Sequence, residues 1–129
     1  MIGRYVLTAE DLLSSHPFPD TVALGGYPID IHNPTGPNTA TVKLQPGQFY
    51  YLPLRCLMVL DVKNLLTAGR CISVTHEAGA AVRVSPIAMA LGQAAGAAAA
   101  ICVADGASVW DVDYNRVRNA LLKLGAILD

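Results

Sequence analysis

Apolar and polar residues alternate, or apolar residues run together, over several short stretches in the first half of the chain. Residues 3–8, 21–32 and 49–60 each predict a β-strand, because such patterns are typical of chain that lies half buried in a sheet. Pro53 places the third strand at a sheet edge or beside a bulge. Residues 32–48, dense in Pro, Gly, Asn and Thr, predict loop and hairpin. The first half therefore predicts a sheet of several strands, partly antiparallel.

Two segments carry the marks of helix ends. Thr8 followed by Asp11 forms a capping-box pattern, which predicts a short helix reaching Leu13. Near the end of the chain, Asp113 predicts the N-cap of a last helix, and Gly125 predicts its stop. The apolar face expected on that last helix consists of Val117, Ala120, Leu121 and Leu124.

A strand, a long connection and a helix are predicted in the second half. Residues 64–69 form the short apolar run typical of a central, parallel-type strand. Ser85 predicts the N-cap of the next helix, Pro86 its first position, and residues 105–106 its end. The connection 69–84 is far longer than the ~2 to 6 residues usual between a strand and a helix. Such long connections at strand ends tend to bind ligands.

The helix predicted after Pro86 is unusually apolar. Residues 87–104 carry no charge and are about as long as the ~20 residues of a membrane crossing, with Gly92 and Gly96 in a GxxxG pair. Alanine dominates the segment, however, Gln93 interrupts it, and no Trp, Tyr or Lys flanks it as an anchor. We therefore expect no membrane span but a helix buried between protein layers, whose two glycines allow close packing.

Composition and charge narrow the classes of partner. The 129 residues are 53% apolar and 15% charged, so the charged share is well below the usual quarter. This predicts that the chain self-associates or belongs to something larger. With a net charge of -1 and no basic stripe, a nucleic-acid partner is not expected. Three scattered cysteines indicate a reducing cytoplasm, and the three histidines lack the spacing of a metal site.

Several side chains that could bind a ligand lie in the connection 69–84. It contains Arg70, His76 and Arg83, and it leads to the start of a helix. A helix N-terminus offers unpaired N–H groups and roughly half a positive charge. The segment therefore predicts a site for an anion or an electron-rich oxygen. A solvated turn at His76 and surface roles for the arginines remain open alternatives.

Several blocks of the sequence together resemble one family. The blocks, in chain order, are GRYVLTAEDL, YPIDIHN, YYLPLRCL, the stretch NLLTAGRCISVTHEAGAAVRVSPIAMALGQAAGAAAA, and VDYNRVRNALLKLGAIL. AGRCIS together with RVSP and ALGQAAG is fairly specific, whereas the alanine run alone is not. The resemblance is to the carboxyl-terminal part of the FAD-dependent oxidoreductases that are distantly related to fumarate reductase flavoproteins, and it covers nearly the whole chain.

The resemblance implies FAD as cofactor and assigns positions to it. One matching turn would lie against the ribityl–phosphate part of FAD, and the start of the next helix would point at N1 and the C2 carbonyl of the flavin ring. His32 and His76 are weak candidates for catalytic residues. A histidine at a strand end, such as His32, more commonly has a structural role. The cofactor positions implied are Gly69, Arg70 and Cys71 in the turn, Arg83, Val84, Ser85 and Pro86 at the helix start, and Gln93 within the helix.

One feature of such flavoproteins is missing from the sequence. No GxGxxG motif for the ADP half of FAD occurs in it. We therefore expect a mixed α+β chain, 1–129, that is one domain or a fragment of a larger FAD-binding α/β fold. Residues 1–63 would form a mainly stranded substrate side, and 64–129 the flavin side.

These expectations fit a truncated gene product, an excised domain or one half of a split enzyme. Its partners would be a dinucleotide-binding portion and a small-molecule substrate, and the chain alone would bind FAD weakly or not at all. The alternative is an inactive remnant or assembly module without catalytic activity of its own.

Overall fold

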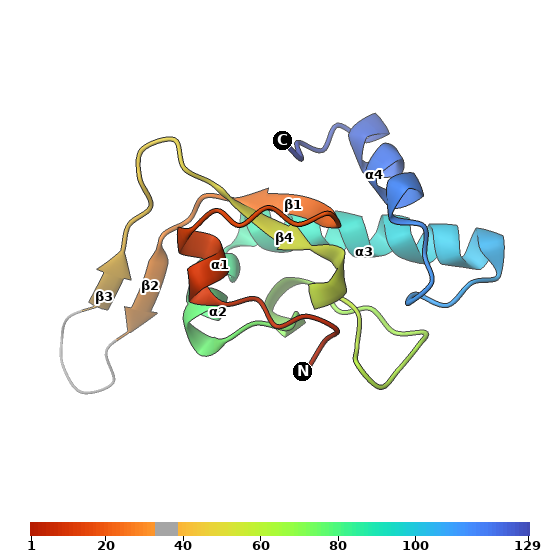
Figure 1. Cartoon of the computed structure of the whole chain (residues 1–129), viewed down its shortest axis with the longest axis horizontal. Helices are drawn as coiled ribbons and strands as arrows, with labels where there is room; N and C mark the ends of the chain where they lie inside the picture. Colours follow the sequence, from red (N-terminus) through yellow and green to blue (C-terminus); the bar gives the residue numbers. More distant parts are fainter. Residues whose placement is uncertain (33–38) are drawn as a thin grey trace.

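The structure is a computed structural model that describes residues 1–32 and 39–129, without the side chains of residues 31, 32, 39 and 40 (Figure 1). Helices and strands are both present, so the predicted α+β class is confirmed. The strands are β1 (Thr21–Gly25), β2 (Ile29–His32), β3 (Thr39–Val42) and β4 (Tyr50–Pro53). The helices are α1 (Ala9–Leu13), α2 (His76–Val82), α3 (Ser85–Asp105) and α4 (Tyr114–Lys123), with 3₁₀ turns at Leu54–Cys56 and Gly69–Cys71.

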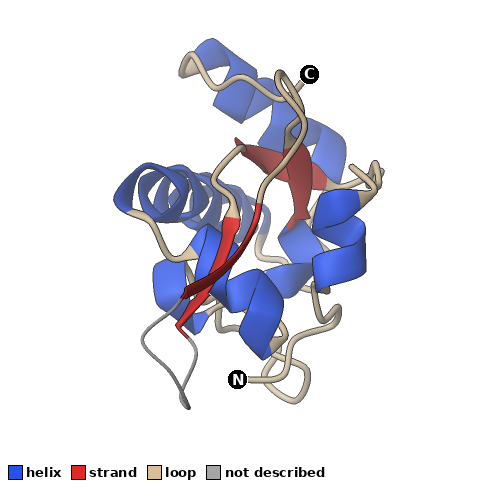
Figure 2. Cartoon of the chain, turned by 90° about the vertical axis from the view of Figure 1, so that its left-hand side faces the viewer, coloured by secondary structure: helices blue, strands red, loops and turns tan. Residues whose placement is uncertain are grey.

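The strands pair in two separate antiparallel sheets (Figure 2). In one, β1 runs against β4 with Gly25 opposite Tyr50, and in the other β2 runs against β3 with Ile29 opposite Val42. The single strand predicted over 21–32 is therefore wrong. It breaks between Gly25 and Ile29, where Pro28 has no N–H to donate to a neighbouring strand.

Two further predicted strands do not form. Residues 3–8 make only isolated bridges, Gly3 to Val59 and Leu7 to Val74. Residues 64–69 make one bridge, through Leu66, and end in the 3₁₀ turn at Gly69–Cys71. An apolar run becomes a central strand only where strands lie on both sides of it. The bridge partners Val59, Val74 and Met58 lie in no strand of the described chain, so both segments stay irregular.

The connection 69–84 is not a continuous loop. It contains α2, whose N-cap is Thr75, with the Thr75 hydroxyl accepting a hydrogen bond from the N–H of Ala78. α1 has the predicted capping box between Thr8 and Asp11. α4 has the predicted cap at Asp113.

α3 packs along the β1–β4 pair and against α4 (Figure 1). Its N-cap is Val84 rather than the predicted Ser85, so Ser85 is the first helical residue. Gly106, with φ +62°, ends the helix as predicted. The stripe that faces the core consists of Ile87, Leu91, Ala94, Ala98 and Cys102.

The other face of α3 is uncovered, so the prediction of a helix buried between layers is wrong for this chain. Met89 is 75% exposed and Val103 is 83% exposed. A Cβ at Gly92 or Gly96 would have no atom within 4 Å, so neither glycine serves a close contact within the chain. Among the described residues, α3 is the one helix long and apolar enough to cross a membrane by length and composition.

α4 closes the end of the β1–β4 pair. Val117 and Leu121 are buried as predicted, but Leu124 is 64% exposed and does not belong to the apolar face. The Tyr114 hydroxyl donates to the carbonyl oxygen of Thr21 at 2.7 Å, which fixes α4 to β1. The core thus lies between the β1–β4 pair, α1, α2 and the inner stripe of α3.

Candidate functional site

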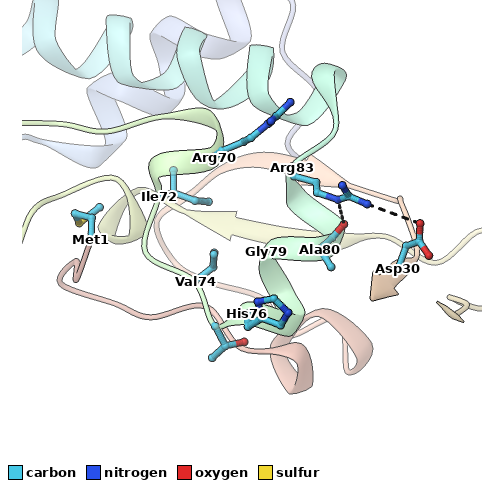
Figure 3. A pocket seen from close by; sticks show the side chains of 10 residues that line it. Met1, Asp30, Arg70, Ile72, Val74, His76, Gly79, Ala80 and Arg83 are labelled. Atoms are coloured by element: carbon cyan, nitrogen blue, oxygen red, sulfur yellow. Dashed lines mark hydrogen bonds and ion pairs between the residues drawn. The ribbon is translucent and has the colours of Figure 1, made fainter. Parts of the chain in front are cut away.

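A cavity of about 460 Å³ brings together three of the predicted site residues (Figure 3). Arg70 reaches it from the 3₁₀ turn, His76 from the first position of α2, and Arg83 from just after α2. Asp30 of β2 joins them, although its spacing in the sequence gave no sign of this. We call this cavity the Arg70–Arg83 pocket.

Arg83 is held by two contacts within the pocket wall. Its Nε donates to the carbonyl oxygen of Ala80 at 3.2 Å, and its Nη2 lies 3.8 Å from Oδ2 of Asp30. The other Asp30 oxygen accepts a hydrogen bond from the Thr41 hydroxyl at 3.3 Å. The Arg83 side chain is still 42% exposed, so it is oriented but remains accessible.

The rest of the pocket wall is largely apolar. Figure 3 shows Ile72 and Val74 along one side, with Arg70 and Arg83 towards one end and His76 towards the other. Gly79 and Ala80 of α2 also line the space. The pocket therefore combines a cationic end with aliphatic walls.

The turn at Gly69 lies against the beginning of α3. Gly69 has φ +63°, and a Cβ built on it would lie 3.6 Å from the Cβ of Ala88. The 3₁₀ turn that it opens also contains Cys71, which is exposed and free. The two segments that the resemblance assigns to the cofactor are thus neighbours in space.

A second cavity, of about 390 Å³, opens at the N-terminus of α3. Val84, Pro86 and Ile87 line it together with residues 24–27. No side chain caps this helix end, and both Ser85 and Pro86 are exposed. The unpaired N–H groups of the first turn are therefore not blocked by side chains of the chain itself. Arg83 and Val84, adjacent in sequence, line the first and second cavity respectively.

Of the predicted cofactor positions, Gly69, Cys71 and Ser85 line neither cavity. Gln93 is exposed on α3, seven residues beyond Pro86, and lines neither cavity. His32 is the last residue of β2, but its side chain lies outside the described part of the structure.

Tyr50 and Gly25 form a contact that sequence reasoning missed. Tyr50 is fully buried, and its hydroxyl lies 3.3 Å from the carbonyl oxygen of Tyr27 and 3.4 Å from that of Ala81. Burial raises the pKa of this phenol well above its ordinary value. Tyr50 thereby connects β4 to the last turn of α2, next to the Arg70–Arg83 pocket.

Within residues 1–32 and 39–129, no group of three or more His, Cys, Asp or Glu side chains is arranged to hold a metal ion. The polar groups at and beside the two cavities include the two arginines, His76, Asp30, the exposed thiol of Cys71 and the open helix terminus.

Comparison with known proteins identifies the class of protein. The family model described as FAD dependent oxidoreductase matches residues 1–121. The chain therefore belongs to the FAD-dependent oxidoreductase family, which confirms the family resemblance, and FAD is the cofactor of that family. No curated protein matches the chain, and no solved structure does.

Proposed function

We propose that this chain forms the wall of a flavin site on the side of the flavin ring, together with part of the substrate pocket. The observation that carries the proposal is the proximity of the Gly69 turn to Ala88 at the start of α3, 3.6 Å from a Cβ at position 69. One ligand can contact both segments. The parent enzyme would transfer hydride between FAD and a small organic substrate.

The residues at this place fit a flavin. The N-terminus of α3 opens onto a cavity and carries no capping side chain. Its dipole would stabilise the negative charge that a flavin ring gains near N1 and the C2 carbonyl on reduction. When bound, FAD supplies the group that accepts or donates the hydride. The proposed contacts with FAD are Gly69, Arg70, Cys71, Arg83, Val84, Ser85 and Pro86. A contact through Gln93 remains a prediction.

The missing partner in this proposal is a dinucleotide-binding portion. The uncovered apolar face of α3, with Met89 and Val103 mostly exposed, supports the idea that another part of a larger protein covers it. We accordingly propose that the chain corresponds to the carboxyl-terminal part of a cytoplasmic flavoenzyme. The substrate would enter through the Arg70–Arg83 pocket. His76 lines this pocket and is the histidine that we propose as the candidate catalytic residue there.

The test is reconstitution. The pure chain is mixed with FAD, with and without a dinucleotide-binding segment from a member of the family, and each mixture is separated by size. We expect flavin absorbance to co-elute with the two-part complex and only weakly, or not at all, with the chain alone. A folded two-part complex that elutes without flavin would contradict the proposal.

A second candidate function is an assembly module without catalytic activity. The same exposed face of α3 favours it, because an apolar helix face can serve self-association as well as docking. Light scattering of the chain alone, combined with the reconstitution above, separates the two functions. Self-association that persists when the dinucleotide-binding segment is in excess, without bound flavin, would favour the assembly module.

A further inference from the structure

We infer that the turn 24–27 forms a second wall of the flavin site and that the ring of Tyr27 packs on the flavin ring. The inference rests on the proposed function, because it takes a flavin as the occupant of the second cavity, of about 390 Å³. It adds contacts from a segment that lies far from the Gly69 turn and from α3 in the sequence.

The second cavity has two walls that come from distant parts of the chain. One wall consists of Val84, Pro86 and Ile87, and residues 24–27 form the other. Among the described residues that line the cavity, Tyr27 is the one aromatic, and it is 38% exposed. The remaining lining side chains are aliphatic. Such a cavity suits a flat ring system with a largely apolar face.

Gly26 points to a close approach of a ligand at this wall. Its φ lies outside the left-handed region, so the backbone conformation does not require glycine. A Cβ at this position would meet only the carbonyl oxygen of Gln48, at 3.9 Å, so packing among the described residues does not require glycine either. Glycine loses the most conformational freedom on folding, and close approach of a ligand to the backbone is one reason to place it.

Gly25, in contrast, is explained by the core. A Cβ on Gly25 would overlap the ring of Tyr50, which is fully buried. The Tyr50 hydroxyl lies 3.3 Å from the carbonyl oxygen of Tyr27, so Tyr50 holds the turn from its inner side. The outer side of Gly26 stays open. The wall is therefore formed before a ligand arrives, which lowers the entropic cost of binding.

The test measures FAD bound to the complex of the chain with the dinucleotide-binding segment. A phenol ring in contact with a flavin quenches the fluorescence of the flavin. We expect Tyr27→Phe to raise the fluorescence of bound FAD several-fold and to keep its affinity, because a ring remains. Tyr27→Leu should raise the fluorescence equally and weaken binding about five-fold, because the stacking contact is lost. Tyr51→Leu, at a tyrosine that lines neither cavity, should change neither quantity.

Gly26→Leu tests the wall itself. The new side chain would project into the space that the flavin ring needs, so FAD binding should weaken at least about ten-fold. The melting temperature of the chain alone should stay the same, since a Cβ at this position has room. If Gly26→Leu fails to fold, the two Tyr27 variants still decide the matter.

The outcomes separate this inference from the proposed function. Bound FAD whose fluorescence and affinity are the same in both Tyr27 variants as in the original chain would overturn the inference. Tight FAD binding by a folded Gly26→Leu chain would also overturn it. Either result leaves the proposed function intact, because flavin is still bound. A folded complex that contains no flavin would contradict the proposed function, and the inference would fall with it.

Discussion

Gly69 places its backbone directly against Ala88, so that the turn after residues 64–68 and the first turns of α3 share one surface. A Cβ at position 69 would meet only the Cβ of Ala88, at 3.6 Å, which is ordinary contact. The conformation, not the space, requires glycine, because φ is +63°. An L-residue pays roughly 1–2 kcal/mol in this left-handed region.

We predict that Gly69→Ala lowers the free energy of unfolding by about 1 kcal/mol, through backbone strain alone. Gly92→Ala is the matched control, because Gly92 also has open space around it but lies inside α3. That change should raise the free energy of unfolding by about 0.5–1 kcal/mol, since alanine is the better helix former. Urea denaturation of both variants measures the difference, and equal effects of the same sign would contradict the account.

Gly25 and Tyr50 give a prediction about packing. A Cβ at position 25 would overlap the ring of Tyr50 and lie 2.9 Å from Cδ1 of Ile87. Because Tyr50 is fully buried, the ring has little room to move. Gly25→Ala should therefore destabilise the fold by about 1–3 kcal/mol, the usual cost of overpacking. Gly26→Ala, whose Cβ would meet only a backbone oxygen at 3.9 Å, should cost far less by thermal denaturation.

The stability of the fold should fall at alkaline pH, because Tyr5 then loses its proton. Burial, followed by the hydrogen bond to Asp11 and its charge, raises the pKa of Tyr5 from 10.0 to about 12. The folded state therefore keeps a proton that the unfolded chain releases at lower pH, so the stabilisation is complete below pH 10. It is lost as the pH rises from 10 to 12, and urea denaturation should show stability falling over this window.

Asp11→Asn tests the cause of that shift. The Tyr5 hydroxyl lies 3.0 Å from each Asp11 carboxylate oxygen. Removing the charge should move the titration of Tyr5, followed by the NMR signal of its ring carbons, to lower pH. Glu10→Gln, a change at the neighbouring acidic residue of α1, should leave that titration in place. If Asp11→Asn leaves the pKa of Tyr5 unchanged, Asp11 does not cause the shift and burial accounts for it.

The exposed face of α3 should drive association of the isolated chain. Met89 and Val103 lie on that face, 75% and 83% exposed. We predict that the double change Met89→Lys and Val103→Lys reduces self-association in sedimentation experiments without lowering the melting temperature. Ile127→Lys is the control, because Ile127 is also 75% exposed but lies beyond α4. An equal reduction by both changes would mean that the α3 face has no special role.

Local signals predicted the helix ends well. Thr8 and Asp113 cap their helices, and Gly106 ends α3, because caps and left-handed glycines depend on a few adjacent residues. The N-cap of α3 was misplaced by one residue, since Val84 offers no capping side chain. The helix α2 was missed although Thr75 caps it, because the Gly- and charge-bearing connection suggested a loop.

Strands and burial could not be predicted in the same way. Residues 3–8 and 64–69 have strand-like apolar patterns, but a strand needs partners that lie elsewhere in the chain. The apolar sequence of α3 likewise does not say which of its faces the chain itself covers. Arg70, His76 and Arg83 were predicted to form one site from their shared connection, whereas Asp30 comes from a distant strand and only the fold brings it there.

The most direct test of the account is to locate bound flavin by NMR. The isotope-labelled chain is combined with a dinucleotide-binding segment of the family, and spectra are compared before and after FAD is added. The account predicts that the amide signals of Gly69, Ser85 and Ile87 shift together, because the turn and the start of α3 contact one flavin. Bound FAD that leaves these three signals in place while shifting others would contradict it.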